Sequence, residues 1–403
     1  MTHHSARPGK PERVALKLTP VERRASIMLA LLFACRMLGL FLLTPVFAVA
    51  AQTIPGGNDA AKVGLALGAY GLTQAFLQIP LGMASDRYGR RPVIVFGLLL
   101  FIAGGVMCAL ASNINWIIAG RVIQGLGAVS AAITAWVADA TRPEVRTRAM
   151  AMVGGSIGVS FAVSLVLSPL LVGQFGLSGL FWAISLLGFV CLLIASFVVP
   201  VVPLADLPIV QARPRDVLHH ADLLRLNFGV FCLHFVLMSI FIVAPGLLGK
   251  LGGYDSAHLW EVYLPVILLS FVLMVPAVFY AETHHAHKVA LEAAVAGLVV
   301  VLALMPLASH AFLALVATFV GFFVAFNILE ALQPSLVSRV APPEFKGLAL
   351  GFYNTAQALG VFSGAVVGGV LVSYGDESKV FLVAAALSFA WFLTARGFKS
   401  PAL

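Results

Sequence analysis

Four ionisable side chains lie deep within long apolar stretches of this 403-residue sequence, namely Arg36, Arg121, His234 and Glu330. A charged side chain within a membrane is costly unless it is paired or hydrated, so these positions indicate function. Arginine binds anions, whereas imidazole and carboxyl groups take up and release protons. Apolar surroundings favour the neutral form of a carboxyl group, so Glu330, the only acid well inside an apolar stretch, suits a proton carrier.

Each of these residues has a second interpretation that the sequence leaves open. Glu330 would also serve as the fixed counter-ion of Arg36 or Arg121, because a buried charge needs a partner. Arg121 would alternatively be held by hydrogen bonds alone, and His234 is equally well explained as a structural histidine. Asn327 adds a neutral polar group and completes the candidate set for proton coupling and the cavity.

A cluster of charge stands between two apolar stretches, at residues 82–91 with the sequence GMASDRYGRR. Charged residues make up only 10% of the chain, so four of them within six positions must contact water. We therefore place Asp86, Arg87, Arg90 and Arg91 in a short loop between two helices. The Asp86 carboxylate needs a partner, which can be a guanidinium or the positive N-terminus of another helix.

The composition indicates which elements must position these groups. Hydrophobic residues make up 61% of the chain and the mean hydropathy is +1.01. Apolar runs of about 20 residues cross a hydrocarbon core roughly 30 Å thick as helices, and these runs are too continuous for the strands of a membrane barrel. We expect an all-α membrane protein with twelve transmembrane helices over residues 26–50, 62–85, 92–112, 114–139, 148–173, 177–199, 224–249, 258–281, 288–308, 310–336, 346–372 and 378–396.

The positive charge is distributed unevenly across this expected membrane. The net charge is +8, which in a soluble protein would favour nucleic acid. Of the 25 lysines and arginines, only Lys62, Lys250 and Lys379 fall on one side, Arg36 and Arg121 fall within spans, and all others share the opposite side. Positive charge accumulates on the cytoplasmic side of membrane proteins, so we expect both termini in the cytoplasm and no nucleic-acid partner.

A short pattern recurs at an offset of 200 residues. Pro-Glu-Val-Arg at 143–146 returns as Pro-Glu-Phe-Lys at 343–346, each time between two expected spans. The repeat predicts two pseudo-symmetric six-helix halves around a central cavity, which rock about a midplane site in alternating access. We expect a monomer. Its units are a cytoplasmic N-terminal arm (1–25), an N-terminal half (26–200), a cytoplasmic linker (201–223), a C-terminal half (224–396) and a cytoplasmic C-terminus (397–403).

The charged loop resembles the signature of the major facilitator superfamily of secondary transporters. The residues that match the signature are Gly82, Asp86, Arg87, Gly89, Arg90 and Arg91. The resemblance implies that Asp86 faces the start of the eleventh helix, near Pro343 and Glu344, and that Arg90 pairs with Asp139. This gating network would lock the outward-open state and break when the protein opens inward. Arg87 and Arg91 are also explained by topology alone.

Two further motifs extend the resemblance. Arg121 and Gln124, within RVIQGLG, are similar to a second motif of the family, whose arginine is associated with proton coupling. The fifth expected span resembles the motif of the drug:proton antiporter branch, with serines in place of two glycines; the residues concerned are Gly155, Ser164, Ser168 and Pro169. Stretches at 36–41, 70–75 and 326–332 resemble one subgroup of this branch. Its named member adds a small cytoplasmic domain after the last span, which we expect to be missing here.

The second half has no true copy of the charged loop. Its equivalent, AETHHAHK at 281–288, keeps an acid but has histidines for arginines, so we expect a one-sided latch. His284, His285 and His287 would bind a metal or sense pH, although a solvated loop explains them more simply. The four cysteines fall within apolar stretches, which predicts buried small hydrophobes without disulfides.

These observations together predict a secondary active transporter that couples protons to the efflux of small molecules across a bacterial-type inner membrane. The alternative is an importer, proton-coupled or facilitative, of a small nutrient that the two arginines would allow to be anionic. We expect protons, the substrate and membrane lipids as partners, with no cofactor and no metal. The spans contain no nucleophile–base pair and no phosphate-binding loop, which argues against an enzyme.

Overall fold

The computed structural model describes residues 18–127, 129–200, 214–342 and 346–398, and this part of the chain is helical without strands. The N-terminal arm to residue 17, residues 201–213 of the linker, and Pro343 and Glu344 lie outside it. The helices are α1 (Pro20–Phe41), α2 (Phe47–Ala50), α3 (Ala60–Tyr88), α4 (Arg90–Ala109), α5 (Ile114–Leu126), α6 (Ser130–Asp139), α7 (Pro143–Leu193), α8 (Pro214–Leu218), α9 (Ala221–Gly252), α10 (Trp260–Thr283), α11 (His287–Ala308), α12 (Phe312–Val340), α13 (Lys346–Ser373) and α14 (Glu377–Arg396).

Ten helical segments in the described ranges are long and apolar enough to cross a membrane. Helix α3 is not among them, although it holds the expected span 62–85. Helix α7 counts once but has 51 residues, about 75 Å at 1.5 Å per residue, which is more than twice a hydrocarbon core. Gly176 interrupts α7 with φ 65° and ψ −171°, between the two spans expected there.

Several helix ends follow directly from the sequence. Thr19 caps α1 in a reciprocal capping box with Glu22, so this helix begins at Pro20 rather than at the expected residue 26. The Asp59 side chain accepts from two backbone N–H groups at the start of α3, and Asn113 does the same for α5. Gly89, with φ 93°, makes the sharp turn between α3 and α4, a conformation that glycine adopts without strain.

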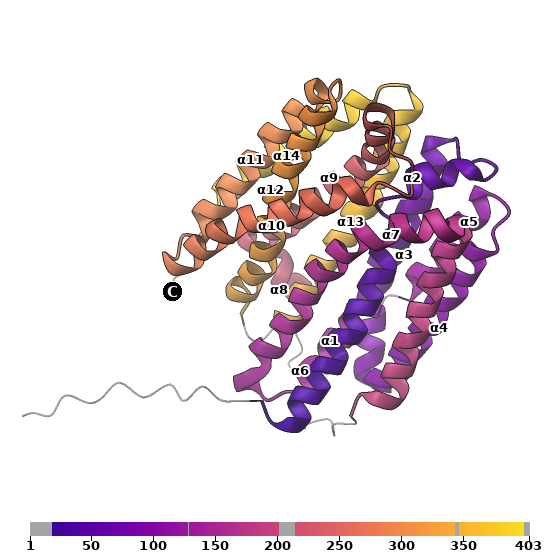
Figure 1. Ribbon diagram of the computed structural model, residues 1–403. Coiled ribbons are helices and arrows are strands. Elements are labelled where there is room, and N and C mark those ends of the chain that lie inside the picture. The colour runs from indigo at the N-terminus through magenta and orange to yellow at the C-terminus, as the bar shows by residue number, and fades with distance from the viewer. Residues whose placement is uncertain (1–17, 128, 201–213, 343–345, 399–403) are drawn as a thin grey trace, which may run out of the picture.

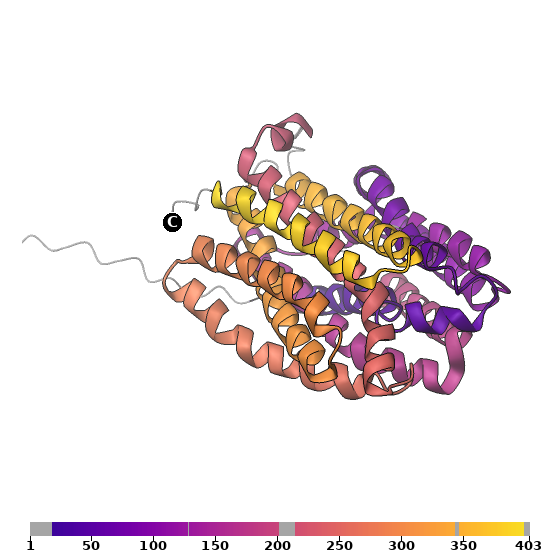
Figure 2. The same ribbon diagram turned by 90° about the horizontal axis from the view of Figure 1, so that it is seen from above.

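The helices form two groups that lie side by side. Figures 1 and 2 show the helices before residue 200 on one side of the molecule and those after residue 214 on the other. Helix α13 packs against both α3 and α9, and α1 packs along α7. We refer to the end of the bundle where α3 begins as the Asp59 end, and to the opposite end as the Asp86 end.

At the Asp59 end the two groups pack tightly. A Cβ atom on Gly64 of α3 would lie 2.2 Å from the Ala365 carbonyl oxygen of α13, so the two backbones are in direct contact. Tyr263 of α10 donates a hydrogen bond of 3.2 Å to the Pro45 carbonyl. Small residues allow such close helix approach. The bundle is therefore closed at this end.

At the Asp86 end the same helices pack more loosely. No residue of α10 from Phe271 to Tyr280 is buried. A Cβ on Gly155 of α7 or on Gly351 of α13 would meet nothing within 4 Å. The helices accordingly diverge towards this end in Figure 1.

Replacing Gly64 by alanine tests the closed end. The added Cβ would overlap the Ala365 carbonyl, so we expect Gly64→Ala to destabilise this conformation by about 1–3 kcal/mol. Thermal unfolding in detergent measures the change. Gly297→Ala in α11 is the matched control, because its Cβ would meet nothing within 4 Å and should leave stability equal or higher. Equal effects of the two variants would contradict the packing described here.

Candidate functional site

A cavity lies between the two helix groups. It is lined from α1, α3, α5, α6, α7, α9 and α13 and from the segment that follows α1; the lining residues are Phe33, Met37, Leu40, Phe41, Leu43, Thr44, Leu67, Tyr70, Gly71, Gln74, Gln78, Arg121, Ser130, Ile157, His234, Met238, Asn354, Gln357, Ala358 and Val361. Eleven of these twenty residues are apolar, and nine have polar side chains. This composition is typical of small-molecule sites.

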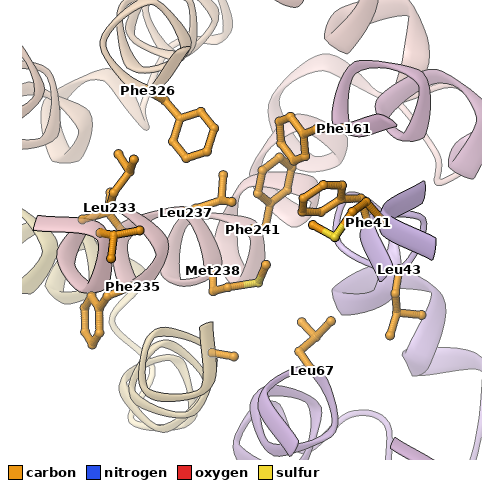
Figure 3. Close-up of a cluster of buried hydrophobic side chains, with 14 of the residues drawn as sticks. Phe41, Leu43, Leu67, Phe161, Leu233, Phe235, Leu237, Met238, Phe241 and Phe326 are labelled. Atoms are coloured by element: carbon orange, nitrogen blue, oxygen red, sulfur yellow. The ribbon is translucent and has the colours of Figure 1, made fainter. Parts of the chain in front are cut away.

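Aromatic rings from both helix groups meet beside the cavity. The Phe161 ring of α7 lies 5.2 Å from Phe41, 6.3 Å from Phe241 and 5.8 Å from Phe326, measured between ring centroids. Figure 3 shows these rings gathered between α1, α7, α9 and α12, with Met238 next to them. Such contacts contribute about 0.5–1.5 kcal/mol each beyond area burial, and they join the two groups without polar atoms.

Arg36 is buried, with 1% of its surface exposed, and is held by neutral partners. Its Nη1 donates 2.6 Å to the Ser130 hydroxyl and its Nη2 donates 2.6 Å to the Tyr70 hydroxyl. The alternative in which Glu330 is its counter-ion does not describe this conformation, because the guanidinium contacts no carboxylate in the part of the chain that the structure describes. Neutral hydroxyls satisfy the geometry of the guanidinium without cancelling its charge.

Arg121 is equally buried and bonds to its own helix and to α3. It donates to the Gln124 side-chain oxygen at 2.9 Å and to the Ala66 and Leu67 carbonyls at 3.3 and 3.5 Å. Its guanidinium lies 4.8 Å from the centroid of the Tyr70 ring, a cation–π distance. Glu330 is not its counter-ion among the described contacts, so the hydrogen-bonded interpretation describes Arg121 here.

His234 and Glu330 face each other across α9 and α12. The His234 Nδ1 lies 3.1 Å from the Val230 carbonyl, which can only accept, and Nε2 lies 2.7 Å from the Gln357 amide nitrogen, which can only donate. The Glu330 Oε2 lies 3.8 Å from Nε2 and has no hydrogen-bond partner in the described residues. A proton on either group would change their interaction.

Gln124 and Asn327 were also predicted as cavity residues. Gln124 binds Arg121 and stands behind the wall, and Asn327 donates 3.0 Å to the Ser270 hydroxyl, which joins α12 to α10. Neither residue lines the cavity, whereas His234 and Arg121 do.

The four candidate residues of the expected fifth span, which lie in α7, are also outside the cavity lining. Ser168 donates to the Leu42 carbonyl of the segment after α1, and Ser164 donates 2.6 Å to the Phe161 carbonyl within α7. Pro169 lies inside α7, and Gly155 has open space beside it. Ser168 thus ties α7 to the neighbouring segment.

The charged loop, residues 82–91, is not a separate connecting segment as expected, because it consists of the end of α3 and the start of α4 with only Gly89 between them. It forms a compact network at the Asp86 end. Arg90 donates 2.7 Å to the Asp139 carboxylate, as the family resemblance implies, and also contacts Ser85 and Asp86. The Asp86 side chain is 64% exposed, and its expected partner near Pro343 lies outside the described residues.

The other residues of this loop have separate contacts. Arg91 donates 2.7 Å to the Val199 carbonyl, while Arg87 lies 5.4 Å from the centroid of the neighbouring Tyr88 ring. Gly82 lies next to Ala131, because a Cβ added at Gly82 would be 3.6 Å from the Ala131 Cβ.

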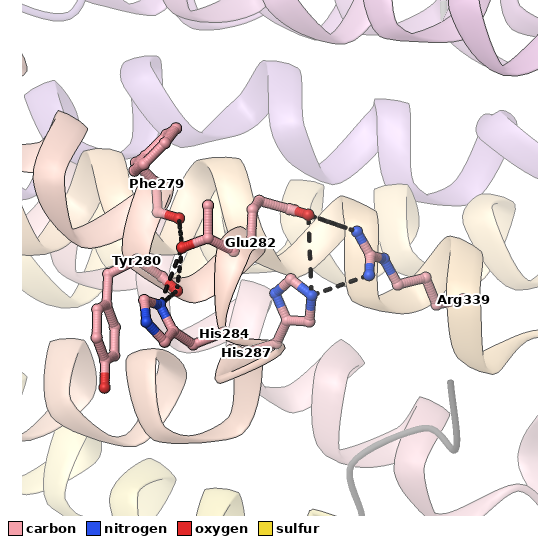
Figure 4. Close-up of polar contacts among 7 residues, drawn as sticks. Phe279, Tyr280, Glu282, His284, His287 and Arg339 are labelled. Atoms are coloured by element: carbon pink, nitrogen blue, oxygen red, sulfur yellow. Dashed lines mark hydrogen bonds and ion pairs between the residues drawn. The ribbon is translucent and has the colours of Figure 1, made fainter.

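A second charged cluster at α10, α11 and α12 was not predicted. Arg339 donates 3.1 Å to both oxygens of Glu282 and lies 2.9 Å from the His287 Nε2, as Figure 4 shows. His287 is buried at 2% exposure, so it does not belong to a solvated loop, whereas His284 and His285 are exposed. The second half therefore also has a charged cluster at this end, and the expectation that the latch between the halves is one-sided stays a prediction.

This cluster corresponds only in part to the first one. Arg339 stands 200 residues after Asp139, the same offset as the repeated Pro-Glu pattern, so the sign of the charge changes at that position, whereas Glu282 keeps the acid of Asp86.

One further ion pair was missed by the sequence analysis. Glu22 at the start of α1 accepts from the Arg142 backbone N–H at 3.1 Å and from its Nε at 2.8 Å. Only the capping pattern of Glu22 was visible in the sequence, because the partner lies 120 residues away.

Ionisable groups held among apolar helices around a cavity define a multi-pass membrane protein with a polar central site. The family model of the Major Facilitator Superfamily matches residues 29–364. The chain belongs to this superfamily, so it is a transporter with a small-molecule substrate and not an enzyme.

Comparisons with individual proteins agree with this assignment. The chain is 42% identical to the inner membrane transport protein YajR of Escherichia coli (strain K12), over 96% of this chain and 85% of that protein. It is 29% identical to the multidrug resistance protein MdtH of Aeromonas salmonicida (strain A449), over 84% and 85% of the two chains. A bacterial homolog of the human lysosomal transporter Spinster, crystallised in an inward-facing and occupied conformation, has the same fold, with a TM-score of 0.76 at 13% identity over 95% and 98% of the chains. The YajR-like subgroup indicated by the motifs is thereby confirmed.

A double-mutant cycle tests the Arg90–Asp139 contact. The two side chains are 14% and 22% exposed, so we expect Arg90→Gln and Asp139→Asn to show a coupling energy on the order of 2 kcal/mol in thermal unfolding. The control is the exposed pair Lys62–Asp59, for which about 0.3–0.5 kcal/mol is expected. Additive effects at Arg90 and Asp139 would show that the contact does not hold the loop.

Proposed function

We propose that this protein is a proton-coupled secondary transporter that exports small molecules from the cell by alternating access. The observation that carries the proposal is the Glu330–His234 contact of 3.8 Å at the edge of the cavity. Carboxyl and imidazole groups both take up and release protons, so a change in the protonation of either one changes the charge of the pair next to the bound substrate. The MdtH relative, a multidrug resistance protein by name, supports the direction of export.

The alternating-access part of the proposal needs two moving halves. We infer twelve spans. Ten of the described segments are long and apolar enough to cross a membrane, α7 counts once among them but holds two spans on either side of Gly176, and α3 adds one more. The halves are residues 26–200 and 224–396, related by the 200-residue repeat. We also infer a monomer, since the cavity is built from one chain.

The proposed orientation follows from charge and from a relative. The excess of lysine and arginine at the Asp86 end supports a cytoplasmic location for that end and for both termini. The YajR relative is named as an inner membrane protein, which supports the bacterial inner membrane. In this orientation the tight packing at Gly64 closes the outer side and the looser end faces the cytoplasm.

The two charged clusters act as cytoplasmic gates in this proposal. Arg90 holds Asp86 and Asp139 within the first half, and Arg339 holds Glu282 and His287 within the second. Because the Asp86 carboxylate is largely exposed here, it is free to meet the start of α13 when the cytoplasmic ends come together. That contact would favour the outward-open state.

Import of an anionic nutrient is the second candidate function, and a specific observation favours it. Arg36 and Arg121 contribute two positive charges beside the cavity, and neither contacts a carboxylate among the described residues. A compound panel tested in both directions distinguishes import from export.

Glu330→Gln tests proton coupling. Glutamine keeps the shape of the protonated acid but cannot release a proton, so we expect pH-gradient-driven accumulation to be lost while exchange without a gradient persists. Purified protein in proteoliposomes, with a compound that the unmodified protein transports, provides the measurement.

The control is Glu292→Gln on α11, an acid that is 29% exposed and pairs with Lys288 at 3.7 Å. It should leave gradient-driven transport unchanged. If the Glu330→Gln variant accumulated the compound at the rate of the unmodified protein, another group would have to carry the proton, and the assignment of proton coupling to Glu330 would be wrong.

A further inference from the structure

The charges around the cavity do not balance. Arg36 and Arg121 are 1% and 2% exposed, and both are bonded only to neutral groups in the described ranges. Among the described residues, Glu330 is the carboxylate deep in the bundle, and it faces His234 instead. Since a neutral hydrogen-bond partner does not cancel a charge, the wall keeps a net positive potential.

Two hydroxyl groups bring this charge to the cavity surface. Tyr70 and Ser130 line the cavity, and each uses its oxygen to accept a hydrogen bond from Arg36. A hydroxyl that accepts in this way still has its own O–H to donate, and neither hydroxyl is engaged as a donor in the described contacts. Donors polarised by a buried cation bind anions more strongly than isolated hydroxyls.

Gln78 adds an unused polar group to the same wall. Its side chain is fully buried and lines the cavity, yet neither amide atom has a hydrogen-bond partner in the described structure. An unsatisfied buried amide is costly, so its presence indicates a ligand group that it contacts. Phe33, Phe41 and Met238 contribute apolar surface to the rest of the wall, which also includes the polar residues Thr44, Gln74, Arg121, His234, Asn354 and Gln357.

We infer that the cavity binds a small amphipathic organic anion, with its carboxylate or sulfonate group at the hydroxyls of Tyr70 and Ser130 and at Gln78, and its apolar body against the phenylalanines. Arg36 is a positioning residue that polarises the two hydroxyls. This inference rests on the proposed transport function and names the substrate class of the same site.

Ligand-induced stabilisation of the purified protein in detergent tests the inference, with benzoate as the anionic probe and benzamide as its neutral counterpart. A ligand that binds only the folded state raises the melting temperature in proportion to the logarithm of its concentration. We expect benzoate to stabilise the protein at concentrations at least about fivefold lower than benzamide, because an ionic hydrogen bond is the stronger one.

Two variants and a matched control localise the effect. Gln78→Met should fold normally, since it removes unsatisfied polar atoms, and should weaken benzoate binding about tenfold. Gln333→Met removes another fully buried amide without partners in the described residues, but one that does not line the cavity, and should leave benzoate binding unchanged. Arg36→Gln should abolish the preference of benzoate over benzamide while benzamide still binds, a ratio that a purely structural role of Arg36 would not alter.

Equal stabilisation by benzoate and benzamide, or none by either, would overturn the inference, as would undiminished benzoate binding by Gln78→Met. The assay uses no proton gradient. Selective benzoate binding without proton-driven transport would therefore overturn the proposed function and keep the anion site. Proton-driven transport without selective benzoate binding would overturn the anion site and keep the proposed function.

Discussion

A guanidinium group placed among apolar helices must find hydrogen-bond acceptors, and this requirement organises the centre of the molecule. Arg36 joins α1 to α3 and α6 through Tyr70 and Ser130, and Arg121 joins α5 to α3. The Tyr70 ring lies between the two cations. These hydrogen bonds fix the relative position and rotation of apolar helices, and they place polar groups on the cavity wall.

The same physical rule operates at the Asp86 end with more water present. Arg90 and Arg339 each hold an acid near the ends of neighbouring helices. In the described residues, the first cluster joins α3, α4 and α6, and the second joins α10, α11 and α12. The close glycine packing at the Asp59 end sets where the two helix groups meet.

Apolar runs in the sequence were sufficient to predict an all-helical membrane protein, because helix length and hydrophobicity are local properties. The Arg90–Asp139 contact joins residues 49 positions apart and was implied by the family resemblance rather than by local pattern. The partners of Arg36 and Glu330 were not predictable, since the choice among serine, tyrosine and carboxylate depends on helix rotation. The cluster at Arg339 was missed because its partner Glu282 lies 57 residues away on another helix.

The central claim is that substrate movement is coupled to protons through this cavity. Accumulation of a transported compound in proteoliposomes of the unmodified protein, measured over a series of imposed pH gradients with the membrane potential held at zero, tests it most directly. One coupled proton predicts an accumulation ratio that changes by up to about tenfold for each pH unit. A ratio that stays at one for every gradient would contradict the account.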